Sequence, residues 1–356
     1  MESIYYVLCW ACHRKCRHCY EARFRPYVRG ALRGVVDEAK AAFPKVIGNL
    51  PEDLTYLDLS APSEAAPGGY ERRPGRIVLA GGELLVAPVR EEVLYPALEA
   101  IRARYAAQGV RTVVQTTGDL VTPEIVRELL ARGVWMISCA GMDDFHVGME
   151  GDKRTPLKER LRAVFEAEGM ADSALAADRR DWSGQGAGHP VYSFFGATED
   201  AWIGKIWPRG RAWENGLSKA TITDNFCNAW SGGLNFLRRG HSGSEVSIDP
   251  NGDVFPCCLK TGRALGNLRE ERLDDILDSL VGHPAFEAIA MGHPERMGLA
   301  YGWDVGRFLD ESRTTATDGK PYRNLCIGCD RFHERVLGPV IDELRATRLA
   351  ARQAAE

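Results

Sequence analysis

The cysteines are the residues of this chain whose type and spacing could do chemistry. Ten are present, and three of them form the pattern Cys12-x3-Cys16-x2-Cys19. In a reducing compartment, clustered thiols are ligands of a metal or an iron–sulfur cluster more often than disulfide partners. Three thiolates can hold part of a four-iron cluster and leave one iron free for another molecule. Zinc is the alternative, although a structural zinc site takes four ligands.

A second group of cysteines lies in the last third of the chain. Cys257 and Cys258 follow residues 245–255, which predict two strands around an Asp-Pro-Asn-Gly turn. The other members are Cys227, Cys326 and Cys329. Four thiolates can hold either an iron–sulfur cluster or a zinc ion. The sequence leaves the choice between Cys257 and Cys258 open.

The elements that must position these residues alternate between strands and helices. Apolar runs predict strands at residues 4–8, 76–80, 111–115, 134–139 and 191–195. Helical spacing predicts helices at residues 28–48, 89–107 and 155–168, and Thr122 with Pro123 begins another. This alternation requires parallel strands with helices outside. We expect residues 51–75 and 170–189 to be loops at the edge opposite the carboxyl ends of the strands.

Glycines and polar residues follow several of these strands. Gly81-Gly82-Glu83 follows the second strand, and Thr116-Thr117-Gly118 ends the third. Ser138 and Cys139 end the fourth, shortly before Asp143-Asp144-Phe145-His146. In a parallel barrel this edge binds ligands. We therefore expect these residues to meet the first three cysteines there.

The order of these landmarks resembles the radical S-adenosylmethionine (SAM) superfamily over roughly residues 4–215. The resemblance rests on CxxxCxφC with His18 before the last cysteine, on Gly81-Gly82-Glu83, and on the two strand ends that follow. It implies an α/β fold, a partial (β/α)6 TIM-like barrel over residues 1–215. It also implies a [4Fe–4S] cluster held by Cys12, Cys16 and Cys19, with SAM on the fourth iron. The cofactor-binding residues would be Gly81, Gly82, Glu83, Thr117, Ser138, His18 and Tyr20.

Residues 247–257 resemble the hairpin of the C-terminal auxiliary-cluster domains of that superfamily, called SPASM or twitch. The resemblance implies that residues 216–356 form a smaller α+β domain with one auxiliary [4Fe–4S] cluster. Its ligands would be Cys227, Cys257, Cys326 and Cys329, with Cys258 spare. The stretch Pro208-Arg209-Gly210-Arg211-Ala212 resembles an element that often precedes this domain. Its arginines and the nearby tryptophans could line a pocket or form the seam between the two domains.

Three residues are candidates for catalysis on the substrate. Cys139 ends a barrel strand, where a thiol could give a hydrogen atom to a substrate radical; the alternative is an inert core thiol. His146 and Asp144 could bind or deprotonate a polar substrate. The alternative for this acidic stretch is an ordinary helix N-terminus.

The function that follows from these expectations is hydrogen abstraction from a small biosynthetic molecule, leading to oxidation or epimerisation. The first strand begins almost at Met1, which leaves no room for an N-terminal peptide-recognition domain. A peptide maturase is the second candidate, and a non-catalytic electron carrier or zinc protein is the third. A flavodoxin- or ferredoxin-type protein would supply electrons. The net charge of −4 argues against nucleic acid as a partner, and the absence of a long apolar run or signal sequence predicts a cytoplasmic protein.

Overall fold

The core of the molecule is a mostly parallel sheet. The computed structural model describes residues 1–173, 189–196 and 205–355. Within these residues the strands run in the order β11-β10-β9-β1-β4-β5-β6-β8-β7. Their bounds are β1 Ser3–Val7, β4 Arg76–Ala80, β5 Arg111–Thr116, β6 Val134–Cys139, β7 Ala171–Asp172, β8 Val191–Phe194, β9 Glu245–Ile248, β10 Asp253–Phe255 and β11 Gly266–Asn267. The strands from β9 to β7 are parallel to their neighbours, while β10 and β11 are antiparallel.

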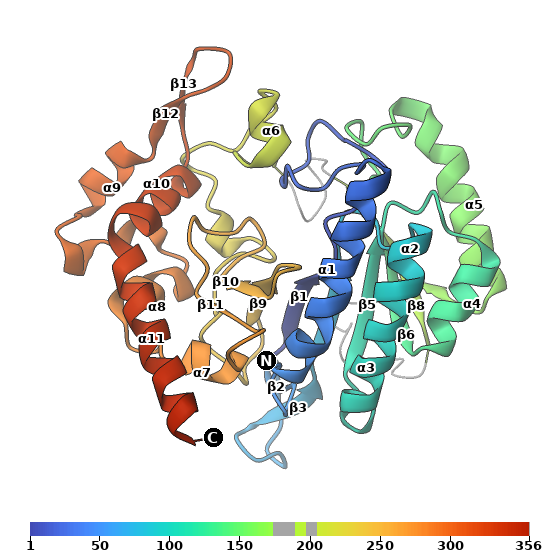
Figure 1. Cartoon of the computed structure of the whole chain (residues 1–356), viewed down its shortest axis with the longest axis horizontal. Coiled ribbons are helices and arrows are strands. Elements are labelled where there is room, and N and C mark those ends of the chain that lie inside the picture. Colours follow the sequence, from blue (N-terminus) through green and yellow to red (C-terminus); the bar gives the residue numbers. More distant parts are fainter. Residues whose placement is uncertain (174–188, 197–204, 356) are drawn as a thin grey trace.

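Helices follow the strands, as the alternation predicts (Figure 1). They are α1 Arg29–Gly48, the run of α2 Ala87–Val89, a π-helical turn Arg90–Leu94 and α3 Tyr95–Tyr105, then α4 Pro123–Ala131 and α5 Arg154–Ala167. The Thr122 side chain accepts a hydrogen bond from the backbone N–H of Ile125 and so caps α4, as expected. The predicted α/β class with helices outside parallel strands is confirmed.

The register of the sheet separates two faces. Tyr5, Val78, Val113 and Met136 are paired across neighbouring strands and form a row on one face. Side chains alternate along a strand, so Ile137 and Cys139 lie on the other face. That second face carries the main core, in which Ile137 and Cys139 pack with helix residues such as Leu161. The first face is the inner side of the partial barrel.

The C-terminal part continues the same sheet. Strand β9 pairs in parallel with β1, with Ser3 opposite Glu245 and Tyr6 opposite Ile248. Figure 1 shows this part, in orange and red, beside β1. The segment before it carries α6 Gly210–Glu214. The part itself contains α7 Leu273–Asp278, α8 Pro284–Ala290, α9 Val305–Glu311, the hairpin β12 Arg313–Thr315 and β13 Pro321–Arg323, α10 Leu325–Phe332, a π-helical turn His333–Leu337 and α11 Gly338–Ala355. The sheet therefore runs across the domain boundary predicted after residue 215.

Residues 51–75 are not the loop that the sequence predicts. They form a two-stranded hairpin of β2 Thr55–Pro62 and β3 Tyr70–Pro74. Asp58 and Arg73 on the two strands form an ion pair at 3.0 Å, and the Asp58 side chain is only 8% exposed. The strand pairing was not predicted because these strands carry many charged and polar residues, whereas the prediction of strands relied on apolar runs. The hairpin's position is as expected, because the Met1 amino group donates to the Thr55 carbonyl at the amino end of β1.

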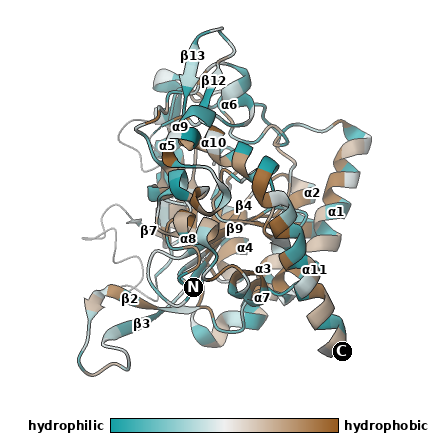
Figure 2. Ribbon diagram, turned by 90° about the vertical axis from the view of Figure 1, so that its left-hand side faces the viewer, coloured by the Kyte–Doolittle hydropathy of each residue, from teal (hydrophilic) through white to brown (hydrophobic). Residues whose placement is uncertain are grey.

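A helix that spans a membrane must be long and apolar, and the helices and the hydropathy of the described residues bear on this requirement. The hairpin β12–β13 is largely hydrophilic (Figure 2). Within the described residues, no helix is both long and apolar enough to cross a bilayer. Most of the predicted loop at residues 170–189 lies outside the described residues.

The buried ion pair of the β2–β3 hairpin gives a test of the fold. Arg73→Ala removes the cation beside the buried Asp58 carboxylate, and we expect it to lower the free energy of unfolding by about 2 kcal/mol. Arg72→Ala is the matched control, because its side chain is 60% exposed, and its effect should stay within about 0.5 kcal/mol. Urea unfolding measures both. Equal effects of the two variants would contradict the assigned register.

Candidate functional site

The first three cysteines lie on one loop after β1. Cys12 is held by a hydrogen bond from its N–H to the Arg25 carbonyl at 3.1 Å, and the Cys19 N–H points to the Cys16 carbonyl at 3.4 Å. Burial raises the pKa of Cys12 to about 12, with Glu83 and the other two thiols adding to the effect. Burial also raises the pKa of Cys19 to about 11. Three thiols on one loop, with no disulfide between them, are a donor set that fits three corners of a four-iron cluster.

The end of β4 packs tightly against this loop. The Gly82 N–H donates to the Cys9 carbonyl at 3.1 Å, and the Glu83 N–H donates to the Ala11 carbonyl at 2.9 Å. A Cβ on Gly82 would lie 2.3 Å from the Ala11 carbonyl oxygen and 2.8 Å from the Cys12 Cβ. The glycine is therefore required by the approach of β4 to the loop, as well as by any ligand.

The Glu83 side chain is buried, and hydrogen bonds hold its carboxylate in place. Its carboxylate accepts hydrogen bonds from the hydroxyl of Thr116 at 2.8 Å and from the N–H of Thr117 at 2.7 Å. The Thr117 hydroxyl and the Leu85 N–H also donate to it. These bonds occupy the carboxylate, which leaves a backbone carbonyl as the acceptor that this motif can offer a ligand.

Thr117 continues the network toward the cysteine loop. Its hydroxyl lies within hydrogen-bond distance of the Asp119 carboxylate as well as of Glu83, so its single proton is shared between the two acids. The Asp119 carboxylate lies 2.7 Å from both His13 Nε2 and Arg14 Nη2. Burial alone would raise the pKa of Asp119, but the hydrogen bonds from His13, Thr117 and Arg14 hold it below its usual value. The carboxyl ends of β4 and β5 and the cysteine loop are thus linked by buried polar contacts.

A cavity of about 230 Å³ opens at this edge of the sheet. Its wall includes nine of the predicted site residues: Cys12, Cys16, His18, Cys19, Tyr20, Gly81, Gly82, Thr117 and His146. The C-terminal part contributes Trp230, Cys258 and Leu259. The predicted residues Glu83, Ser138, Cys139 and Asp144 are not among the wall residues. Residues of both the N-terminal and the C-terminal part of the chain therefore line the cavity.

His146 is held in this cavity by Asp143, which the sequence analysis placed at this edge but did not name among the catalytic candidates. Asp143 is 1% exposed and accepts from the N–H groups of Phe145 and His146. A hydrogen bond of 2.9 Å joins its Oδ1 to Nδ1 of His146. Since a carboxylate only accepts, it favours the Nδ1–H tautomer and leaves Nε2 as an acceptor. A signal for Asp143 was available in its three-residue spacing to His146.

His18 lies against His146, with ring centroids 4.4 Å apart. Burial, helped by His146, lowers the pKa of His18 to about 4, so the ring is neutral near pH 7. Its Nδ1 is buried and has no hydrogen-bond partner among the described residues. The same holds for the indole N–H of Trp207, which also lines the cavity. Both nitrogens are therefore buried polar atoms, beside the cavity, without a partner among the described residues.

Asp144 and Cys139 point elsewhere. The Asp144 side chain is 66% exposed and pairs with Arg154 at 3.0 Å. Cys139 is fully buried, and a Cβ on Gly118 would lie 3.4 Å from its Sγ and 2.7 Å from Leu161. Cys139 therefore lies on the helix-covered face of the sheet, as the alternative of an inert core thiol predicts. Ser138 faces the inner side, where its hydroxyl bonds that of Ser193 at 2.8 Å.

Four cysteines of the last third gather in a second group. Burial raises the pKa of Cys257 to about 12 and that of Cys326 to about 11. It also raises the pKa values of Cys227 and Cys329 well above the usual range, and neighbouring thiols of the group add to both shifts. Cys326 and Cys329 share one face of α10. The neighbourhood of Cys258 contains Cys257 and Glu245 instead, and Cys258 lines the cavity. This arrangement favours Cys257 as the ligand.

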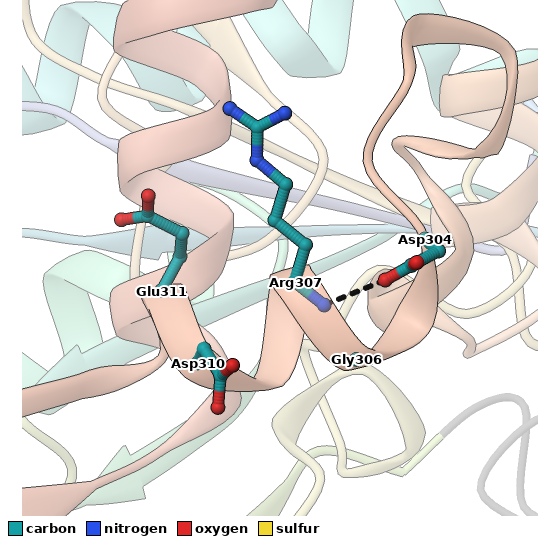
Figure 3. A pocket seen from close by; sticks show the side chains of 5 residues that line it. All are labelled: Asp304, Gly306, Arg307, Asp310 and Glu311. Carbon is teal, nitrogen blue, oxygen red and sulfur yellow. Dashed lines mark hydrogen bonds between the residues drawn. The ribbon is translucent and has the colours of Figure 1, made fainter.

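A separate hollow lies on α9, lined by Asp304, Gly306, Arg307, Asp310 and Glu311 (Figure 3). Asp304 caps α9 by accepting from the Arg307 N–H at 2.7 Å. The Arg307 guanidinium lies over the Trp303 ring, and Glu311 pairs with Arg335. These are ordinary contacts of a helix surface, and none of the predicted site residues lies there.

The Glu83 network gives a test of this geometry. Glu83→Ala leaves the buried Thr116 hydroxyl and Thr117 N–H without their acceptor, and we expect a loss of about 3 kcal/mol in the free energy of unfolding. Glu91→Ala is the control on the same segment, because the Glu91 side chain is 59% exposed. A loss below about 1 kcal/mol for Glu83→Ala in urea unfolding would contradict the anchoring role.

Comparison with known proteins gives one partial family match and several distant structural likenesses. No curated protein matches the sequence. Three solved structures with a distant likeness are BtrN in complex with AdoMet and 2-DOIA, anSMEcpe with bound AdoMet, and Streptococcus suis SuiB bound to precursor peptide SuiA. Each is 13% identical to this chain. Their TM-scores are 0.39, 0.41 and 0.39, and the alignments cover 82%, 96% and 81% of this chain. They cover 88%, 98% and 66% of the respective structures.

The family comparison concerns the C-terminal part. Residues 241–330 match the SPASM family model, described as an iron–sulfur cluster-binding domain. The match contains Cys257, Cys326 and Cys329, three of the four cysteines that the fold gathers.

Proposed function

We propose that this chain is a radical SAM enzyme that abstracts hydrogen from a small biosynthetic molecule and oxidises it. One observation carries the proposal: the thiols of Cys12, Cys16 and Cys19, the Gly81-Gly82 edge and side chains of the C-terminal part line a single cavity. In this proposal Cys12, Cys16 and Cys19 hold a [4Fe–4S] cluster, and SAM binds beside Gly81 and Gly82. When bound, cluster and SAM supply a 5′-deoxyadenosyl radical that takes a hydrogen atom from the substrate.

The chain's own residues position the ligands and exclude water. In this proposal a backbone carbonyl beside Gly82 accepts from the ammonium group of SAM, because the Glu83 carboxylate already accepts hydrogen bonds from Thr116 and Thr117. Tyr20, Trp207 and Leu259 give the wall an apolar character and close it toward the C-terminal part. A largely apolar wall limits the side reactions of reactive species with solvent.

His146 is the proposed base for the proton that oxidation releases. Asp143 orients its ring and leaves Nε2 available, and the residue lines the cavity. Cys139, the thiol that epimerisation was expected to use, packs on the opposite face of β6. Oxidation is therefore the better-supported branch, and Cys258 is the thiol to examine if the product proves to be an epimer.

A peptide maturase remains the second candidate, distinguished by a peptide product in a substrate screen. In either case a flavodoxin- or ferredoxin-type protein is the proposed electron donor.

SAM cleavage tests the proposal directly. Anaerobically reconstituted protein, reduced with dithionite and given SAM alone, should release 5′-deoxyadenosine and methionine, measured by liquid chromatography and mass spectrometry. Cys16→Ala should lower the rate at least about 100-fold, because it removes a cluster ligand. Cys139→Ala is the control, and it should retain the wild-type rate with a stability loss of about 1 kcal/mol. Equal rates for wild type and Cys16→Ala would refute the proposal, as would no release by the wild type.

The second cluster is tested by its iron. Wild type should bind about eight iron atoms per chain, as expected for two four-iron clusters. Cys257→Ala should lose much of the iron of the auxiliary cluster, whereas Cys258→Ala should keep all of it. The reason is that Cys257, and not Cys258, lies with the other three thiols. Iron analysis and electron paramagnetic resonance (EPR) of both variants measure this. The reverse result would exchange the roles of the two cysteines.

A further inference from the structure

Residues 207–212 lie between the two cysteine groups and contact both. Arg209 donates from Nη2 to the Cys326 carbonyl at 3.2 Å and from Nε to the Leu259 carbonyl at 3.3 Å. Arg211, two residues later, donates from Nε to the Cys16 carbonyl at 2.9 Å. One arginine thus holds the loops of the second group, and the other holds the loop of the first.

The backbone of this segment is fixed against the first loop. The Ala212 N–H donates to the Cys19 carbonyl at 3.1 Å. Gly210 has a φ of +48°, and a Cβ there would lie 2.5 Å from the Tyr20 carbonyl carbon and oxygen. A side chain at residue 210 would force the segment away from the loop. Glycine at this position allows Arg209 and Arg211 to reach opposite sides.

The two arginines differ in their compensating charge. Arg209 forms an ion pair with Asp330 at 2.9 Å, directly after the ligand Cys329. Arg211 is 5% exposed and donates to the carbonyls of Cys16 and Ala22. In the described part of the chain it forms no ion pair with a carboxylate. A buried cation without a counter-charge costs several kcal/mol. The thiolates of Cys12, Cys16 and Cys19 are the negative charge that would compensate it.

We propose that Arg211 and Arg209 set the reduction potentials of the two clusters separately, each acting on the cluster at its own side. A fixed positive charge stabilises the electron that a one-electron reductant of the flavodoxin or ferredoxin class delivers, and so raises the potential. Asp330 opposes Arg209 at the second cluster. The inference rests on the two clusters of the proposed function, and it makes the arginines positioning residues with an electrostatic role.

Redox titration followed by EPR tests this with reconstituted full-length protein. Arg211→Gln should lower the potential of the first cluster at least tenfold in its one-electron equilibrium, about 59 mV, and leave the second unchanged. Arg209→Gln should do the converse. Asp330→Asn should raise the second potential alone. Arg211→Lys and Arg209→Lys keep the charge without the bidentate geometry, so they should retain most of the wild-type potential.

Each outcome decides the question. Unchanged potentials in both glutamine variants, or lysine variants that shift as far as the glutamine variants, would overturn the proposal in favour of a purely structural role. Loss of iron from Arg211→Gln but not from Arg211→Lys would support charge compensation, and loss from both would overturn it. If the wild type itself holds fewer than two clusters, the proposed function fails first, before any variant is compared.

Discussion

The close packing of β4 on the cysteine loop is the constraint on which the rest of the site depends. Two backbone hydrogen bonds, from Gly82 to Cys9 and from Glu83 to Ala11, join them. A side chain at residue 82 would collide with the Ala11 carbonyl. This contact places the Cys12 thiol beside the strand end, where the Glu83 carboxylate can bind Thr117 and fix the next strand. Cluster ligands and ligand-binding backbone are thereby parts of one rigid unit.

A second constraint brings the distant cysteines to this unit. Strand β9 pairs with β1, so the hairpin that precedes Cys257 begins beside the strand that precedes Cys12. Arg209 and Arg211 then fix the two groups of loops to one segment. Cys257 consequently lies with the other thiols of the second group, whereas its neighbour Cys258 lines the cavity. A continuous sheet achieves what a flexible linker between two domains would not.

The sequence predicted the features that depend on local chemistry. The strand ends at Ala80 and Cys139, the Thr122 cap and the hairpin around residues 249–252 each follow from propensity and turn residues, and all are present. The hairpin β2–β3 was missed because its strands are held by the Asp58–Arg73 ion pair and not by an apolar stripe.

The direction of individual side chains was less predictable. Cys139 ends its strand as expected. Side chains alternate between the two faces of a strand, and the packing of the helices decides that Cys139 lies on the helix-covered face and not on the cavity face. Asp143 and Asp144 are adjacent acids, and the turn over residues 143–146 brings Asp143 to His146 while Asp144 pairs with Arg154. The pairing of β9 with β1 joins residues far apart in sequence, so no local pattern could reveal it.

The central claim is that three thiolates leave one iron open to SAM. EPR and Mössbauer spectra of the reduced protein, recorded with and without SAM, test it most directly in Cys257→Ala, where the signal of the first cluster is least overlapped. The account predicts that SAM changes the spectrum of one iron of this cluster, as a new nitrogen and oxygen ligand would. Spectra that stay identical when SAM is added at saturating concentration would contradict it.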